Sequence, residues 1–389
     1  MMGPLSGLKV VEFAGIGAGP HCAMMLADMG AEIVRIDRLQ PAGLGVEVEP
    51  KFDFLMRGRR SLAIDLKSPT GREVVFEMIA RADALLESFR PGVMERIGLG
   101  PDVCLRVNPR LVYARLTGWG QTGPYAGMAG HDINYIALSG ALDAMGAPDR
   151  CPQPPLNLLG DFGGGALHCA FGVVSALFHA HRSGQGQVVD AAMIDGVTLM
   201  MSLVLGWRKA GKWSDRKSDN VVDGGSPYYS TYRTADDRFI AIGAMEEKFY
   251  ELLLEKLGLS QLQHMRPHTD RALWSEQRRT FEAVFRTKTR DEWSSLLEGT
   301  DACFAPVLSM HEAPEHPHIK ARGIYRELNG VQQPSPAPRL SLASNVGVSS
   351  APRIGEHSRE VLRDWGWDQD AIAKLVGNGV VFQATEVGR

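Results

Sequence analysis

Several features that mark other classes of protein are missing from this sequence. No stretch of about 18 consecutive apolar residues occurs, so no membrane-spanning helix is predicted. The chain shows no basic segment followed by an apolar one, as a secretory signal would, and its last three residues are not a peroxisomal tripeptide. The five cysteines are scattered without a CxxC pair, which excludes a CxxC zinc or redox motif and fits a reducing compartment. We therefore expect a cytoplasmic protein.

An excess of charge of one sign is also missing. The 389 residues include 42 Lys and Arg and 45 Asp and Glu, for a net charge of −3. This balance predicts binding neither to nucleic acid nor to an anionic membrane. Hydrophobic residues make up 44% of the chain and charged residues 22%, as in soluble globular proteins. At roughly 150 residues per domain, the length predicts two or three domains.

The first third of the chain alternates between two hydrophobic patterns. Amphipathic stretches at Pro20–Met29 and Pro69–Ala80 predict helices. Short apolar runs predict buried strands at Lys9–Ala14, Glu32–Asp37, Ser61–Leu66, Ala84–Phe89 and Leu111–Leu116. Strands that alternate with helices imply right-handed crossovers, so we expect an α/β fold: a Rossmann-like large domain with a mostly parallel sheet.

The pattern changes further along the chain. Residues 121–195 are predicted to be mainly helical, and Met193–Trp207 reads as a long buried helix. A hairpin signal over 228–244 opens a smaller α+β domain, and a final helix near Glu356–Trp365 should pack on the first domain. The predicted organisation is a large domain over 1–208, a linker over 209–225, a small domain over 226–325 and a C-terminal segment over 326–389 that returns to the large domain.

A glycine-rich turn follows the first predicted strand. Residues 15–20, Gly-Ile-Gly-Ala-Gly-Pro, invite a dinucleotide-binding interpretation, and Asp37 lies about 20 residues further on. However, the last glycine position of that fingerprint is Pro20, so the spacing favours a simple strand-to-helix turn. The motifs of protein kinases, zinc peptidases and α/β-hydrolases are incomplete or missing.

Three acid or base residues have unusual surroundings. His131 follows Gly130 and precedes Asp132 at a predicted helix start, where free N–H groups could stabilise an oxyanion. Asp161 lies between apolar residues and a triple glycine that would let a ligand approach, and burial there would raise its pKa. Glu246 ends a strand of the second domain. Asp132 or Asp161 could instead cap a helix, and spacing alone does not show that these residues converge.

Eight segments of the chain resemble the family III CoA-transferase superfamily and, within it, the α-methylacyl-CoA racemase branch. Those typical of the branch are Gly130–Tyr135 and Asn157–Gly165. Those typical of the superfamily are Leu5–Glu12, Gly30–Asp37, Arg90–Gly100, Leu116–Pro124, Gly186–Asp190 and Gly355–Leu362. Transferases of the superfamily place a nucleophilic aspartate near the position of Asp161 but as a rule lack a counterpart of His131.

The resemblance implies an interlocked homodimer whose active site lies between the large domain of one subunit and the small domain of the other. It also implies His131 and Asp161 as two bases, supported by Glu246 and Asn157. One base would remove the α-proton of a 2-methylacyl-CoA thioester and the other would return a proton on the opposite face of the enolate. Backbone N–H groups at the His131–Asp132 helix start would hold the enolate oxygen. No redox cofactor or metal is expected.

Binding of the CoA part requires cations for its phosphates and an apolar surface for its adenine. The expected cations are Arg38, Lys67, Arg90 and Arg96, of which the resemblance favours Arg38 and Arg96. The resemblance places Ile64 and Leu66 at the adenine, and Tyr135 could contact the pantetheine arm. Met193, Leu199, Met200 and Leu203 could accommodate the acyl chain, although packing in a core helix is the favoured interpretation of these residues.

The sequence is also compatible with two other functions. A CoA-transferase would use Asp161 as a covalent nucleophile and would not need His131. A non-catalytic acyl-CoA-binding protein would bind the thioester without either reaction. Exchange of the α-proton with solvent deuterium separates these alternatives.

Overall fold

The structure is a computed structural model that describes residues 3–41, 43, 45–342 and 349–385. It divides into two compact units. The first unit comprises Met1–Ser139, Pro155–Met200 and Gly323–Arg389, and the second comprises Gly140–Pro154 and Met201–Arg322. The domain ranges expected from the sequence stay a proposal, and the compact units differ from them chiefly at 140–154, which groups with the second unit.

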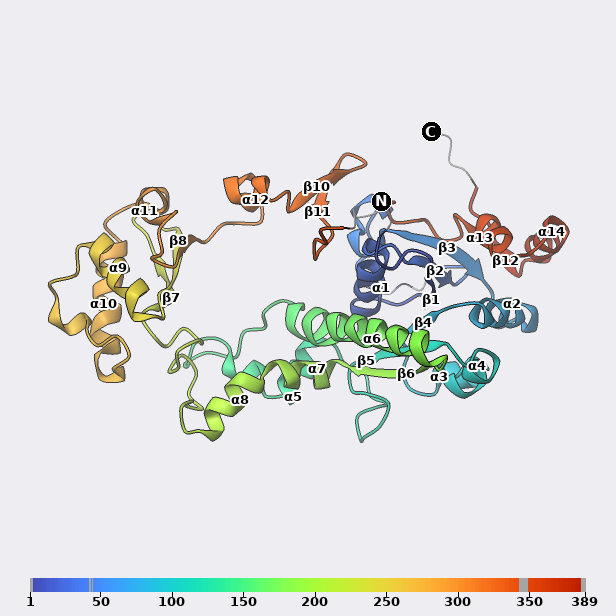
Figure 1. The fold of residues 1–389 in the computed structure, drawn as a ribbon, viewed down its shortest axis with the longest axis horizontal. Coiled ribbons are helices and arrows are strands. Elements are labelled where there is room, and N and C mark those ends of the chain that lie inside the picture. Colours follow the sequence, from blue (N-terminus) through green and yellow to red (C-terminus); the bar gives the residue numbers. More distant parts are fainter. Residues whose placement is uncertain (1–2, 42, 44, 343–348, 386–389) are drawn as a thin grey trace. The chain divides into compact units, whose positions relative to one another are not determined.

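The first unit contains a seven-stranded sheet in the order β12-β3-β2-β1-β4-β5-β6 (Figure 1). Neighbouring strands are parallel except for β12, which runs antiparallel to β3. The strands are β1 (Lys9–Phe13), β2 (Glu32–Asp37), β3 (Arg59–Ile64), β4 (Ala84–Glu87), β5 (Val112–Thr117), β6 (Gln187–Ala192) and β12 (Val381–Phe382). The predicted α/β class with a mostly parallel sheet is therefore confirmed.

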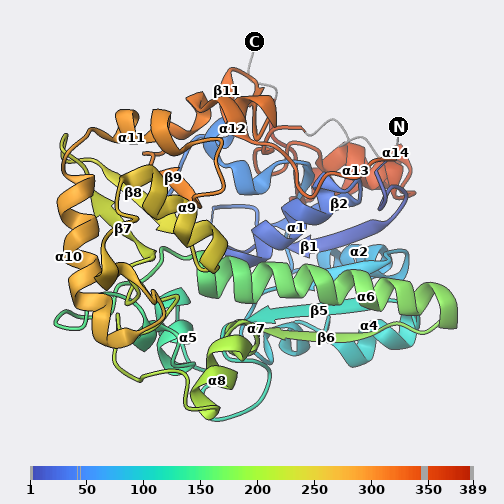
Figure 2. The ribbon, with the colours of Figure 1, turned by 60° about the vertical axis from the view of Figure 1, so that its left-hand side comes forward.

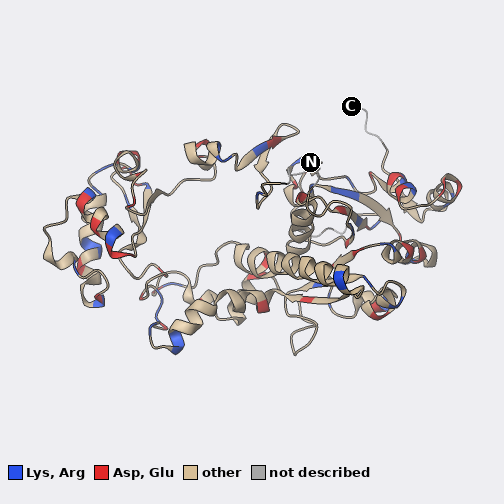
Figure 3. Cartoon of the chain, viewed as in Figure 1, with Lys and Arg blue, Asp and Glu red and all other residues tan. Residues whose placement is uncertain are grey.

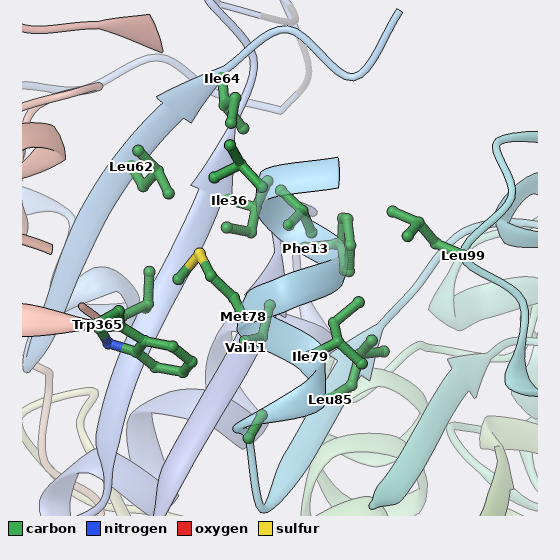
Figure 4. Close-up of a cluster of buried hydrophobic side chains, with 14 of the residues drawn as sticks. Val11, Phe13, Ile36, Leu62, Ile64, Met78, Ile79, Leu85, Leu99 and Trp365 are labelled. Atoms are coloured by element: carbon green, nitrogen blue, oxygen red, sulfur yellow. The ribbon is translucent and has the colours of Figure 1, made fainter. Parts of the chain in front are cut away.

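Successive residues of each strand point to opposite faces of the sheet, and each face is covered by helices. On one face, Val11 packs with α2 (Pro69–Ala80) and with the C-terminal helices α13 (Ser358–Asp364) and α14 (Gln369–Gly377), as Figure 4 shows in part. On the other face, Val10 packs with α1 (Ala18–Asp28) and α6 (His168–Ser183), and α6 runs along β5 and β6 in Figure 2.

The first unit also contains α3 (Val93–Arg96), α4 (Pro101–Val107), α5 (Asp132–Leu138), the π-helix η4 (Leu158–Leu167), α7 (Met193–Met200) and the 3₁₀ turns η1 (Pro50–Phe52) and η2 (Phe54–Met56). A hairpin of β10 (Tyr325–Leu328) and β11 (Val331–Pro334) follows in the same unit.

The second unit has a three-stranded antiparallel sheet in the order β7-β8-β9. Its elements are α8 (Ser202–Lys209), β7 (Tyr229–Arg233), β8 (Phe239–Gly243), α9 (Glu247–Leu257), α10 (Trp274–Phe285), α11 (Arg290–Leu297), β9 (Phe304–Pro306), α12 (Pro317–Ala321) and the 3₁₀ turns η3 (Leu142–Ala144), η5 (Gln263–Met265), η6 (Arg271–Leu273) and η7 (Ala313–Glu315). An aromatic core of Tyr232, Phe281 and Phe285 joins this sheet to α10. The predicted hairpin over 228–244 is confirmed by β7 and β8.

Three details differ from the sequence predictions. The strand β6 lies in the region expected to be mainly helical. The predicted helix Met193–Trp207 is interrupted at Met201, and its apolar residues Leu199 and Leu203 are exposed by 61% and 58%, so the prediction of one long buried helix was wrong. The proline- and serine-rich residues 331–353 were predicted to form an extended connection, but the first of them form β11, which pairs with β10 in a hairpin. An apolar pattern predicts that a side chain is buried, but it does not predict which part of the protein or which partner buries it.

Trp365 tests how strongly the C-terminal helices hold the sheet. It follows α13, is 2% exposed, and donates a hydrogen bond from Nε1 to Glu32 Oε1 at 2.9 Å. We expect Trp365→Ala to lower the free energy of unfolding by about 3–5 kcal/mol, because it leaves a large cavity beside β2 and β3. Urea titration measures this loss. Leu342→Ala, at a side chain 88% exposed, should change stability by less than about 0.5 kcal/mol.

Candidate active site

A cavity of about 390 Å³ lies at the carboxyl ends of the parallel strands. We call it the switch-point cavity, because strand order reverses between β1 and β4, where α/β sheets bind ligands. Each contributing strand supplies a short stretch of lining: Ala14–Gly19 at β1, Asp37, Arg38 and Gln40 at β2, Ser88–Pro91 at β4, and Leu116–Trp119 at β5. All the residues that line it belong to the first unit.

His131 reaches the cavity from the loop that follows β5. It is the N-cap residue of α5, as the sequence predicts, and its backbone N–H donates to Asn134 Oδ1 at 3.0 Å. Tyr135, one turn later, packs its ring against Trp119 at 4.7 Å between centroids and donates its hydroxyl hydrogen to the carbonyl of Gly130. The loop that carries His131 is therefore held on both sides of the histidine.

Asp161 lies on the cavity wall, in the π-helix η4. The glycines that follow it allow close packing of helices. A Cβ on Gly164 would lie 2.8 Å from the carbonyl oxygen of Met193, and one on Gly196 of α7 would lie 2.0 Å from that of Gly164. The triple glycine, which was predicted to let a ligand approach, instead lets α7 approach. On the other side of Asp161, a Cβ on Gly17 would lie 3.3 Å from Oδ2.

Burial raises the pKa of the Asp161 carboxyl, as expected from the sequence. The neighbouring Asp132 carboxylate also raises it, whereas the amide of Asn157 lowers it by donating from Nδ2 to Oδ2 at 3.1 Å. The proximity of His131 lowers it further. Asp161 can therefore hold a proton at a higher pH than an exposed aspartate, which a residue that alternately takes and returns a proton requires.

Asp132 is the first residue of α5 and is 6% exposed. Its Oδ1 accepts the backbone N–H of Asp161 at 2.7 Å, and its Oδ2 has no hydrogen-bond partner among the described residues. The role of its backbone N–H as an oxyanion donor stays a prediction. The side-chain contact with Asp161 was not foreseen.

The predicted CoA contacts divide into two groups. Arg38, Arg90 and Tyr135 line the switch-point cavity. Arg96 and Lys67 are exposed outside its lining, while Ile64 is 1% exposed within the core and Leu66 packs against that core. The roles of all these residues in binding CoA stay predictions.

Glu246 belongs to the second unit, where it is the exposed N-cap residue of α9. Its proposed support of His131 stays a prediction. Within the described ranges, no group of three or more His, Cys, Asp or Glu side chains has an arrangement that could hold a metal ion.

Two contributors to the cavity were not proposed from the sequence. Gly17, with a φ of 67°, is the N-cap residue of α1 after the β1 turn, and Ser88 directly follows β4. Gly15 and Gly19 both lie close to Ser88, since a Cβ on them would approach Ser88 Oγ at 2.4 and 3.1 Å. The glycine turn and its position after a strand were visible in the sequence, but the strand order that brings Ser88 beside it was not.

The chain matches the family model described as CoA-transferase family III over residues 5–358. The chain belongs to the family III CoA-transferases. It is 47% identical over 380 residues to a protein of Mus musculus named alpha-methylacyl-CoA racemase, and 44% identical over 382 residues to one of the same name from Homo sapiens. Both alignments cover 97% of this chain and 97% of the relative.

A solved structure of a CaiB/BaiF family protein from Brucella suis has the same fold, with a TM-score of 0.78 and 27% identity. That alignment covers 94% of this chain and all of the other. The resemblance drawn from the sequence, to family III CoA-transferases and to their racemase branch, is therefore confirmed.

The contact between Asn157 and Asp161 predicts a titration shift. Asn157→Ala removes a hydrogen bond that favours the charged carboxylate, so the pKa of Asp161, already raised by burial, should rise further. NMR titration of the Asp161 carboxyl carbon measures the shift. Gln185→Ala, an exposed amide in the turn after α6, is the control and should leave the titration unchanged. A fall in the pKa of Asp161 in Asn157→Ala would contradict the assigned role of Asn157.

Proposed function

We propose that this protein inverts the α-carbon of 2-methylacyl-CoA thioesters by moving protons between two bases. The observation that carries the proposal is the presence of His131 and Asp161 on the wall of one cavity at the switch point of the sheet. Relatives that share 44–47% of its residues over nearly the whole chain carry the name alpha-methylacyl-CoA racemase, which supports this reaction over others in the family.

The chemistry requires two proton carriers because the enolate of the thioester is planar. A base on one face removes the α-proton, and an acid on the opposite face must deliver another. His131 and Asp161 are the two carriers. In one direction His131 accepts the α-proton while protonated Asp161 donates, and in the other direction the roles are reversed. The raised pKa of Asp161 allows its carboxyl to be protonated when donation is needed.

The switch-point cavity can hold the reacting end of the thioester together with part of its CoA. Arg38 and Arg90 line its wall and are suited to phosphate groups. Met128 and Met193 also line it, and their flexible side chains can adapt to acyl chains of different shape. We also propose that catalysis needs neither metal nor redox cofactor and that the protein acts in the cytoplasm.

Incubation of one epimer of a 2-methylacyl-CoA in deuterated water tests the reaction. The wild-type protein should produce the other epimer with deuterium at carbon 2, and His131→Ala should lower the inversion rate by about 10²–10⁴-fold. Chiral chromatography with mass spectrometry measures both. A covalent CoA adduct on Asp161 without deuterium uptake would instead indicate a transferase, and tight thioester binding with neither would indicate a binding protein.

We further propose that the protein is a homodimer in which α6 packs against a second copy. Leu167, just before α6, and Phe171, Val174 and Phe178 within it recur at helical spacing along one row and are 42–74% exposed. Figure 3 shows that most of α6 carries no charged residue. A contiguous exposed apolar face of this kind is typical of a protein–protein interface rather than of a surface that stays in contact with water.

Together, η4 and α6 form a helical stretch, Leu158–Ser183, that by length and composition alone could cross a membrane. Of its most apolar part, 39% is buried within the protein. This is weak evidence for a span, because a helix between two protein surfaces has the same composition. The packing of one face of α6 on β5 and β6 favours a protein partner for the other face. That the protein does not enter a membrane stays a prediction.

Phe171→Lys tests the proposed interface. A lysine in the centre of the apolar row would be desolvated in a dimer but solvated in a single chain, so it should shift the protein from dimer to monomer. Light scattering after size-exclusion chromatography measures the mass. His179→Lys introduces the same charge at an exposed position outside the row and should leave the dimer intact. A wild-type protein that elutes as a single chain at micromolar concentration would refute the proposal.

A further inference from the structure

The two segments that carry the proposed bases are joined through one side chain. Asp132 follows His131 directly in the chain, and its Oδ1 accepts the backbone N–H of Asp161 at 2.7 Å. The carboxylate of Asp132 therefore connects the start of α5 with the π-helix η4, although the two ends of the hydrogen bond are 29 positions apart in the sequence.

The surroundings of this carboxylate leave it little freedom to move. The residue is 6% exposed, and a Cβ on Gly160 would lie 2.5 Å from its Oδ1 and 3.2 Å from its Cα. Only a glycine at position 160 lets the side chain lie directly against the backbone of η4. Such a buried carboxylate is costly unless it is hydrogen-bonded, and Oδ1 is the oxygen that has a partner among the described residues.

We propose that Asp132 is a positioning residue that sets the separation of the two bases by holding the peptide of Asp161 at a fixed distance from the peptide of His131. The inference rests on the proposed racemisation. Proton transfer requires contact within hydrogen-bond distance. A displacement of Asp161 by about 1 Å should therefore greatly slow proton transfer to and from Asp161, while proton transfer to and from His131 stays unchanged.

This asymmetry gives a specific signature in deuterated water. In Asp132→Ala, His131 still removes the α-proton from the epimer whose α-proton faces it. The displaced Asp161 donates a proton poorly to the opposite face, so the enolate accepts deuterium from His131 on the original face. For that epimer, the ratio of exchange with retention to inversion should rise by about tenfold or more. For the other epimer, exchange and inversion should fall together. A general loss of structure would lower all rates for both epimers and would not change either ratio.

Two further variants separate the hydrogen bond from other effects. Asp132→Asn keeps an oxygen that can accept the N–H of Asp161. Its ratio of exchange with retention to inversion should therefore stay within about twofold of wild type, whatever its overall rate. Gly160→Ala places a methyl group where Oδ1 lies and should raise the ratio with Asp132 still present. The double variant Asp132→Ala/Gly160→Ala should be little worse than Asp132→Ala, because both changes remove the same contact.

A measurement without substrate separates this inference from the proposed function. The amide hydrogen of Asp161 should exchange with solvent at least about tenfold faster in Asp132→Ala than in wild type or Asp132→Asn, as NMR can record. Unchanged ratios for both epimers in Asp132→Ala and Gly160→Ala, or an unchanged amide exchange rate, would overturn the positioning role. A wild-type protein that neither exchanges nor inverts would refute the racemase proposal, while the amide measurement would still decide whether the contact holds Asp161.

Discussion

The hydrogen bond between the Asp132 carboxylate and the Asp161 amide is the constraint on which the site depends. One end belongs to the first residue of α5, and the other to the π-helix η4, which begins 20 residues after α5 ends. Neither segment could place its own acid or base relative to the other. The bond is 2.7 Å long, and Asp132 is 6% exposed, so separating the two segments would leave a nearly buried carboxylate without this partner.

Glycine makes this contact possible because it removes side chains at places of close approach. Gly160 lets Asp132 lie against η4, while Gly164 and Gly196 bring η4 and α7 into direct backbone contact. The result is a π-helix packed on several sides, and π-helical segments are often found at functional sites. The backbone of Asp161 is thus held in place, while the hydrogen bond from Asn157 lowers the pKa of its carboxyl.

The sheet supplies the second level of organisation. The reversal of strand order between β1 and β4 leaves a crevice at their carboxyl ends, and the loops that leave those strands form its walls. The C-terminal helices and Trp365 close one face of the sheet, far in sequence from the strands they cover. The other face is covered by α1 and α6, and α6 is left with a second apolar row that we assign to a partner chain.

The sequence by itself determined the local elements and the identity of the chemical groups. Residues 32–37 and 69–80 were placed correctly because hydrophobic period and helix-start signals act over a few residues. Six segments spread along the chain identified the family, and the motifs around His131 and Asp161 identified its racemase branch. Only the tertiary structure decided that these two residues share a cavity, that the triple glycine receives α7, and that Asp132 holds Asp161. Those facts depend on strand order and on contacts between distant segments, which local patterns do not encode.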